Sequence, residues 1–508
     1  MARTKIGAYG AAVFAIIVCG LVPRASAQAS YDELISEART LSYNVKFDEA
    51  ESLFAAASRL SPSRPQSYFG IAQIRLWTFL GTENPSDFSA FNKASDRAVF
   101  MAQHALDADP HDYRATFLLG ELYLNRTLAE VTAHSFLAAF WNVRSAYGYF
   151  EKTLELNPKF YSAYRGVGEI HYFLNLIPGA AKWILPLAGL SADKAKGFSE
   201  IRLAYQEGTV DKVEATLSLA QVYETYLAEY DSAEALMRNL VTEFPNNPMF
   251  NYHLAVVLLK ETKLHEAEHY LDAVLRMNDP TFIVLNNLSI FLKGDVYFKL
   301  NEFSKAIKYN EIFLNRTKGP DYTGITNYRL AISYRAIGKL DSMRKCLVRA
   351  KNGNSSIYDD SYADRQSEKF LKAGISRDEL KLIEMRNDLA AGKFEEVYSI
   401  LIPAMKNIHD INLQAEGFTI LSEAAVRLGK FAEGLKYAES SDTIDPEDES
   451  WVRPRSWYLT AACDYHFGYF DAARTFLKKA AGTDAYERDD RFSAAVNNLE
   501  RKLEKDKN

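Results

Sequence analysis

One short pattern recurs along the chain. An Ala is followed four positions later by an apolar residue, usually large, then three positions later by a residue that is usually small, and five positions after that by Pro. Spacings of four and three place three side chains on one face of a helix, and Pro ends a helix because it has no amide hydrogen. The clearest copies are Ala50-Phe54-Ala57-Pro62, Ala98-Ala102-Ala105-Pro110, Ala146-Phe150-Thr153-Pro158 and Ala233-Met237-Leu240-Pro245.

A second pattern precedes the first and predicts a partner helix. A small residue lies among larger ones and would let two helices approach closely. Its copies are Tyr164-Val167-Gly168-His171, Ile290-Lys293-Gly294-Tyr297, Asn327-Leu330-Ala331-Tyr334 and Phe418-Leu421-Ser422-Ala425. Glycines suited to a left-handed turn between the two helices are Gly338, Gly392, Gly429 and Gly468. The pair of patterns is that of the tetratricopeptide repeat (TPR).

The spacing predicts an all-α, TPR-type solenoid of about eleven helical hairpins with one apolar insertion. A single hairpin cannot bury its apolar face, so the hairpins must stack on one another. An irregular helical bundle is the alternative, but four copies at identical offsets disfavour it. The hairpins are expected to begin near residues 31, 65, 113, 161, 214, 248, 287, 324, 378, 415 and 454.

The regular spacing divides the chain into segments. Hairpins with insertions are expected over 28–174, a regular array over 213–352, and further hairpins over 353–508. Between the first two segments, residues 175–212 hold an apolar insert followed by a helix near Ala195 to Glu207. Insertions in solenoids map to one face and often carry function.

The insert admits three interpretations. It is a plug that packs between hairpins, a lid over the concave face, or a loop that carries Trp183, Ile184 and Leu185 into a membrane interface. Tryptophan suits that depth because its ring is amphipathic.

Two stretches resemble a known family. The segment Gly189 to Gly197 reads Gly-Leu-Ser-Ala-Asp-Lys-x-x-Gly after a Pro-Gly-apolar-Leu-Pro stretch, and Trp451-Val452-Arg453-Pro454 opens a closing repeat. Together they resemble the eukaryotic tetratricopeptide-39 and inclusion-body clearance proteins. The resemblance implies helical repeats, peripheral association with an outer membrane and no known chemistry. An export signal would depart from that family.

The first 27 residues have the order of a secretory signal peptide. Arg3 and Lys5 precede an apolar run from Ile6 to Val22, and Ala25-Ser26-Ala27 offers a cleavage site. The run, about seventeen residues long, is near the lower limit for a membrane span, so an uncleaved anchor stays open. Cleavage after Ala27 removes three basic residues and no acidic ones, which takes the formal charge from −6 to −9. This balance disfavours a nucleic-acid partner.

Residues 265–269 read His-Glu-Ala-Glu-His, which matches the zincin signature. In a zincin the two histidines bind zinc and the first Glu is the general base. The same letters fit the second helix of a hairpin, with Ala267 and Leu271 in the core and His265 and His269 pointing away from it. No third ligand follows at the expected spacing, so no metal, cofactor or catalytic residue is assigned.

The first helices of successive hairpins are expected to line the concave face. Counting inward positions predicts an aromatic and aliphatic strip that would anchor a helix or an extended apolar segment. The alternative is that these side chains pack against a returning helix or the insert. The candidate partner-binding residues are Tyr252, Val256, Leu259, Phe291, Phe298, Tyr328, Ile332 and Arg335.

These observations favour a non-enzymatic scaffold, exported to the periplasm or outer-membrane face, that binds a protein or peptide. A peripheral membrane or lipid-binding protein acting through residues 175–190 is the second hypothesis. A zinc metallohydrolase at His265 and His269 is the third.

Overall fold

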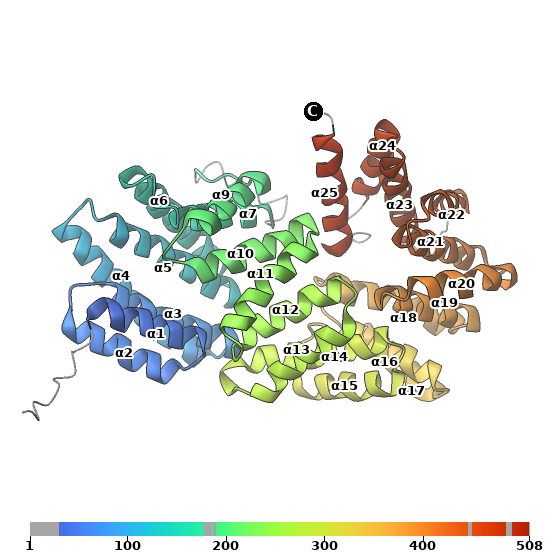
Figure 1. Ribbon diagram of the computed structural model, residues 1–508. Helices are drawn as coiled ribbons and strands as arrows, with labels where there is room; N and C mark the ends of the chain where they lie inside the picture. The colour runs from blue at the N-terminus through green and yellow to red at the C-terminus, as the bar shows by residue number, and fades with distance from the viewer. Residues whose placement is uncertain (1–29, 177–184, 186–188, 445–449, 484–489, 507–508) are drawn as a thin grey trace, which may run out of the picture.

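The computed structural model describes residues 30–176, 185, 189–444, 450–483 and 490–506, and every regular element in them is helical (Figure 1). Short helical turns are η1 (Leu174–Leu176), η3 (Tyr223–Leu227, a π-helical turn), η4 (Pro280–Phe282) and η5 (Met405–Asn407). The α-helices are α1 (Tyr31–Tyr43), α2 (Phe47–Leu60), α3 (Gln66–Thr82), α4 (Pro85–Ala108), α5 (Tyr113–Thr132), α6 (Phe136–Leu156), α7 (Ala163–Phe173), α9 (Lys194–Glu207), α10 (Lys212–Val222), α11 (Tyr230–Glu243), α12 (Pro248–Lys260), α13 (Leu264–Met277), α14 (Ile283–Lys299), α15 (Phe303–Arg316), α16 (Thr323–Ala336), α17 (Leu340–Ala350), α18 (Tyr358–Ala373), α19 (Arg377–Ala390), α20 (Phe394–Ala404), α21 (Ile411–Arg427), α22 (Phe431–Ile444), α23 (Val452–His466), α24 (Phe470–Ala481) and α25 (Asp490–Lys505).

The predicted solenoid of helical hairpins is confirmed. All eleven predicted hairpins have a first helix that begins close to the expected residue. The sequence patterns did not predict α18, which is unpaired between two hairpins, or α25, which follows the last hairpin.

The repeat residues form the contacts between paired helices. Ala50, Phe54 and Ala57 are buried on α2, and Ala146, Phe150 and Thr153 are buried on α6. The helices that carry the four clearest copies, α2, α4, α6 and α11, each end two residues before the predicted Pro. The pattern therefore sets both the buried face of the second helix and the point at which the helix stops.

The turns within several hairpins need a left-handed backbone. Gly338, Gly392, Gly429 and Gly468 have φ between +74° and +78°, as the sequence predicted. Glycine adopts this conformation without the clash that a Cβ would cause.

The insert brings the chain very close to α7. A Cβ on Gly168 would lie 2.7 Å from the carbonyl oxygen of Gly197, so only glycine permits this contact between α7 and α9. Leu185 is buried among Phe117, Phe150 and Leu190. Its placement contradicts the predicted membrane contact for this residue, because the side chain fills a core. Trp183 and Ile184 lie outside the described residues, as do residues 1–27.

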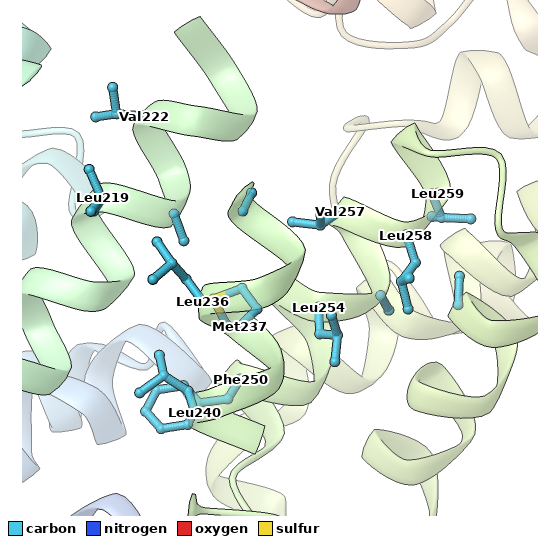
Figure 2. Close-up of a cluster of buried hydrophobic side chains, with 14 of the residues drawn as sticks. Leu219, Val222, Leu236, Met237, Leu240, Phe250, Leu254, Val257, Leu258 and Leu259 are labelled. Carbon is cyan, nitrogen blue, oxygen red and sulfur yellow. The ribbon is translucent and has the colours of Figure 1, made fainter. Parts of the chain in front are cut away.

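The largest apolar core lies in the middle of the chain, where it joins neighbouring hairpins. Leu219 and Val222 of α10, Met237 of α11, and Phe250 and Leu254 of α12 pack together (Figure 2). Each hairpin thus buries its apolar face against its neighbour, as a solenoid requires.

Contacts between distant segments bend the array back on itself. The Asn247 side chain donates to the backbone carbonyl of Tyr43 at 2.8 Å, and Asn387 donates to the carbonyl of Phe298 at 2.9 Å. At the end of the chain, α25 returns to η3, and Figure 1 shows it near α11 and beside α23. Over the described residues, no helix combines the length and hydropathy needed to cross a bilayer.

Candidate functional site: the inner cavity

A cavity of about 360 Å³ lies on the inner face of the C-terminal hairpins. We call it the inner cavity. Residues of α14, α16, α19, α21 and α23 line it, and these are the first helices of five successive hairpins. Helix α18 adds Tyr358, Asp359 and Tyr362, and α25 adds Arg491 and Phe492. Residues distant in sequence therefore meet in one hollow of the size usual for ligand sites.

Cationic side chains outnumber acidic ones in the lining of the inner cavity. The acidic residues are Asp295, Asp359 and Glu423, and the cationic residues are Lys299, Arg329, Arg386, Arg427, Arg455 and Arg491. The whole chain has the opposite balance, with a formal charge of −6. The positive charge is thus local to this face.

Asp295 on α14 is held by two cations. Arg329 lies 2.9 Å and Lys299 lies 2.7 Å from its carboxylate oxygens. Burial would raise the pKa of the Asp295 carboxyl, but Arg329 and Lys299, with a smaller effect from Arg491, hold it below its usual value. Asp295 is therefore ionised at neutral pH and already neutralised by its neighbours.

Glu423 on α21 forms a two-point ion pair with Arg455. The two hydrogen bonds measure 2.8 Å and 3.2 Å. Burial works to raise the pKa of Glu423, but Arg455, then Arg491 and Arg427, lower it overall. The latter two guanidinium groups therefore act on the same carboxylate without bonding to it.

Arg427 and Arg491 differ from the other cations of the cavity. Among the described residues, neither has a carboxylate oxygen within ion-pair distance. The guanidinium of Arg427 lies over the ring of Phe394, 4.7 Å from its centroid. Arg491 donates to the carbonyl of Lys260 at 2.9 Å. Both retain hydrogen-bond donors for a ligand, since a guanidinium has five N–H groups.

Helix α25 closes one side of the inner cavity. Asn498 donates to the carbonyl of Leu227 in η3, and Arg501 pairs with Glu229 at 3.3 Å. The other face of α25 packs Val496 and Leu499 against Leu477 of α24. The helix thus bridges the end of the array to its middle and carries Arg491 into the cavity wall.

The predicted aromatic strip is not an open surface. Leu259, Phe291, Phe298, Tyr328 and Ile332 are buried. Tyr252, Val256 and Arg335 are half-buried. Only Phe298 and Tyr328 contribute to the lining of the inner cavity.

Neighbouring helices cover that strip. Tyr328 contacts Tyr362 and Phe370 of α18, with ring centroids 5.8 Å and 6.2 Å apart, and Arg335 donates to the carbonyl of Ile375 at 3.0 Å. The unpredicted helix α18 therefore replaces the solvent that the strip was expected to face. Whether any of these residues binds a partner stays a prediction.

The His265 to His269 pair lies on the exposed side of α13. Both histidines are exposed, while Ala267 between them is buried. Glu266, the would-be general base, forms an ion pair with Arg238. Within the described part of the chain, the one group of three ligand residues close enough for a metal is Asp231, Glu234 and Glu261, which includes neither histidine.

A second charged group lies in the N-terminal half. Arg165 on α7 is buried and bonds Asp211 at 2.6 Å, Glu169 at 2.7 Å, and also Glu121. Glu214 accepts a hydrogen bond of 2.5 Å from Tyr43 and lies 3.8 Å from Arg39. We call these residues the N-terminal charge cluster. It has four carboxylates and two guanidinium groups. Arg165 bonds three of the carboxylates, while one oxygen each of Glu121, Asp211 and Glu214 is buried without a hydrogen-bond partner.

Comparison with known proteins supports the repeat assignment. Residues 152–332 match the model of the family Iml2/Tetratricopeptide repeat protein 39. The match confirms the resemblance stated from the sequence. It covers the end of α6, then α7, the insert, α9 to α15 and most of α16, but not the hairpins that complete the inner cavity.

Two solved TPR structures are also similar to the chain. The yeast Tom70 crystal structure is 14% identical, covers 94% of this chain and 96% of its own, and has a TM-score of 0.26. The P58(IPK) TPR domain is 13% identical, covers 94% and 99%, and has a TM-score of 0.21. A search of curated proteins finds none that matches.

Proposed function

We propose that this chain is an exported, non-enzymatic scaffold that binds an extended segment of a partner protein in the inner cavity. The observation that carries the proposal is the inner cavity itself, because the first helices of five successive hairpins line it. Its mixture of aromatic and charged side chains suits a peptide, which offers both apolar groups and hydrogen-bonding groups. The family match and the TPR-type fold support the proposal, because proteins with this fold are typically scaffolds that bind other proteins.

Site-specific photocrosslinking tests the proposal. Phe394 lines the inner cavity, and p-benzoylphenylalanine keeps an aromatic ring at that position. The matched control carries the same crosslinker at Tyr469, which is 63% exposed. We expect one defined protein to crosslink at position 394 and not at 469 in cells. Equal crosslinking at both positions, or none at 394, would contradict the proposal.

Export rests on residues 1–27 alone. N-terminal sequencing of the protein from the periplasmic fraction is expected to begin at Gln28. Recovery only in the cytosol would remove export from the proposal and leave the binding function to be judged by the crosslinking result.

An exposed apolar edge supports the peripheral membrane hypothesis at a place other than the insert. Phe136, Leu137 and Trp141 of α6 are 65%, 72% and 53% exposed, and Leu128 and Val131 at the end of α5 are also exposed. Large exposed apolar groups of this kind mark protein or membrane contacts. We expect liposome flotation of the wild type to be lost in Leu137→Asp and kept in Ile411→Asp, a change at a similarly exposed but isolated side chain. Equal flotation of all three proteins would exclude this edge as the membrane contact.

A further inference from the structure

The surplus positive charge of the inner cavity identifies the class of segment that it would bind. Asp295 is neutralised by Arg329 and Lys299, and Glu423 is neutralised by Arg455. Arg386 pairs with Glu416, 3.1 Å away and outside the lining. After these pairs are formed, Arg427 and Arg491 still present guanidinium groups without a carboxylate partner among the described residues.

The two guanidinium groups act on one carboxylate. Both lower the pKa of Glu423, and Arg491 also lowers that of Asp295. They come from α21 and from α25 respectively, so the return of α25 brings them together. Arg427 is exposed and Arg491 is half-buried. Charges of one sign that line a hollow attract an anion more strongly than the same charges would in bulk water.

Aromatic rings hold several guanidinium groups in place. Arg427 lies 4.7 Å from the Phe394 centroid, Arg386 lies 5.3 Å from Trp451, and Arg455 lies 5.6 Å from Phe492. A guanidinium held over a ring keeps its N–H edge directed outward, and that planar edge matches a carboxylate with two parallel hydrogen bonds. The half-buried rings of Phe394 and Trp451 also offer apolar surface to the side chains beside a carboxylate.

We propose that the inner cavity binds an acidic peptide segment, with carboxylates on Arg427 and Arg491 and the neighbouring side chains against Trp451 and Phe394. This inference rests on the proposed function and names the chemistry of its ligand. The carboxylates come either from Asp and Glu side chains or from a chain terminus. A volume of about 360 Å³ limits the bound part to a few residues.

Binding of matched peptide pools tests the inference. The probes are fluorescein-labelled octapeptides in which four positions are Asp or Glu, compared with pools that carry Asn or Gln there. Each pool is made with a free and with an amidated C-terminus. Fluorescence polarisation with the full exported protein is expected to show binding of the acidic pool about tenfold tighter than of the amide pool. The preference should weaken as salt increases.

Two variants assign that binding to the cavity. Arg427→Gln removes one of the two guanidinium groups, and Arg344→Gln on α17 is the matched control, since Arg344 is exposed on the second helix of its hairpin. We expect the first to weaken binding of the acidic pool about tenfold and the second to leave it unchanged. Arg491→Gln should behave as Arg427→Gln does, with thermal unfolding recorded for each to exclude loss of fold.

The outcomes separate the inference from the proposed function. Equal binding of all four pools, with crosslinking at position 394 retained, overturns the acidic preference and leaves the scaffold function standing. Acidic binding that Arg427→Gln and Arg344→Gln weaken equally overturns the assignment to the inner cavity. If only the free C-terminus confers tight binding, the source of the carboxylate is a chain end, which supports the same site.

Discussion

The N-terminal charge cluster and the inner cavity differ in how their charges are satisfied. In the cluster, Arg165 bonds three carboxylates and both it and Glu121 are buried. In the cavity, Arg427 and Arg491 have no carboxylate partner among the described residues. A guanidinium group that is already bonded to carboxylates of the same protein has few donors left for a ligand. A guanidinium group without a carboxylate partner beside a cavity can still donate to a ligand.

The largest effect is expected at the centre of the N-terminal charge cluster. Arg165→Leu would leave Glu169 and Asp211 without their shared cation and Glu121 without its hydrogen-bond donor, and uncompensated buried charges are strongly destabilising. We expect the free energy of unfolding in urea to fall by about 3–5 kcal/mol. A loss similar to that of a surface substitution would show that the cluster is not a closed network.

The cluster should also make stability depend on pH. Burial raises the pKa of Glu121 to about 8 from 4.5. Between those values the folded state keeps a proton that the unfolded state releases, so the contribution of Glu121 to stability declines as pH rises through this window. Each unit of pKa shift corresponds to about 1.4 kcal/mol.

The variant Glu121→Gln cannot titrate and should lack that decline. We expect the unfolding free energy of the variant, relative to wild type, to increase from pH 4.5 to pH 8. Asp107→Asn, at an exposed carboxyl on α4, is the control and should run parallel to wild type. Parallel curves for Glu121→Gln would refute the buried titration.

A smaller effect is expected where α25 meets η3. Asn498→Ala removes the donor to the carbonyl of Leu227 and should cost about 1 kcal/mol of local stability. Amide hydrogen exchange at residues 223–229 should become faster, while Lys502→Ala on the exposed face of α25 should leave it unchanged. Unchanged exchange in both variants would mean that α25 does not hold this side of the cavity.

The smallest effect on stability is expected at Arg427. Its side chain is exposed and bonds no carboxylate, so Arg427→Gln should change the unfolding free energy by no more than about 0.5 kcal/mol. Together with the binding loss proposed above, this would identify Arg427 as a residue kept for a ligand. A loss near that of Arg165→Leu would erase the difference between the two regions.

Much of the fold could be predicted from the chain because a TPR hairpin is a local structure. Phe54 is buried by residues of its own hairpin and of the next one. The turn at Gly338 needs a positive φ, which glycine adopts without help from distant residues. The prediction that Tyr328 faces solvent was wrong, because α18, a helix that carries no repeat pattern, packs against it.

The sequence by itself determined the helical hairpins, their boundaries and the acidic balance of the chain, since periodicity, Pro and Gly act within a few residues. Only the tertiary structure decided that Arg427 and Arg491 share one cavity. That meeting depends on the curvature of the whole array and on the return of α25 to η3. Small rotations between successive hairpins accumulate along a solenoid, and no single repeat encodes their sum.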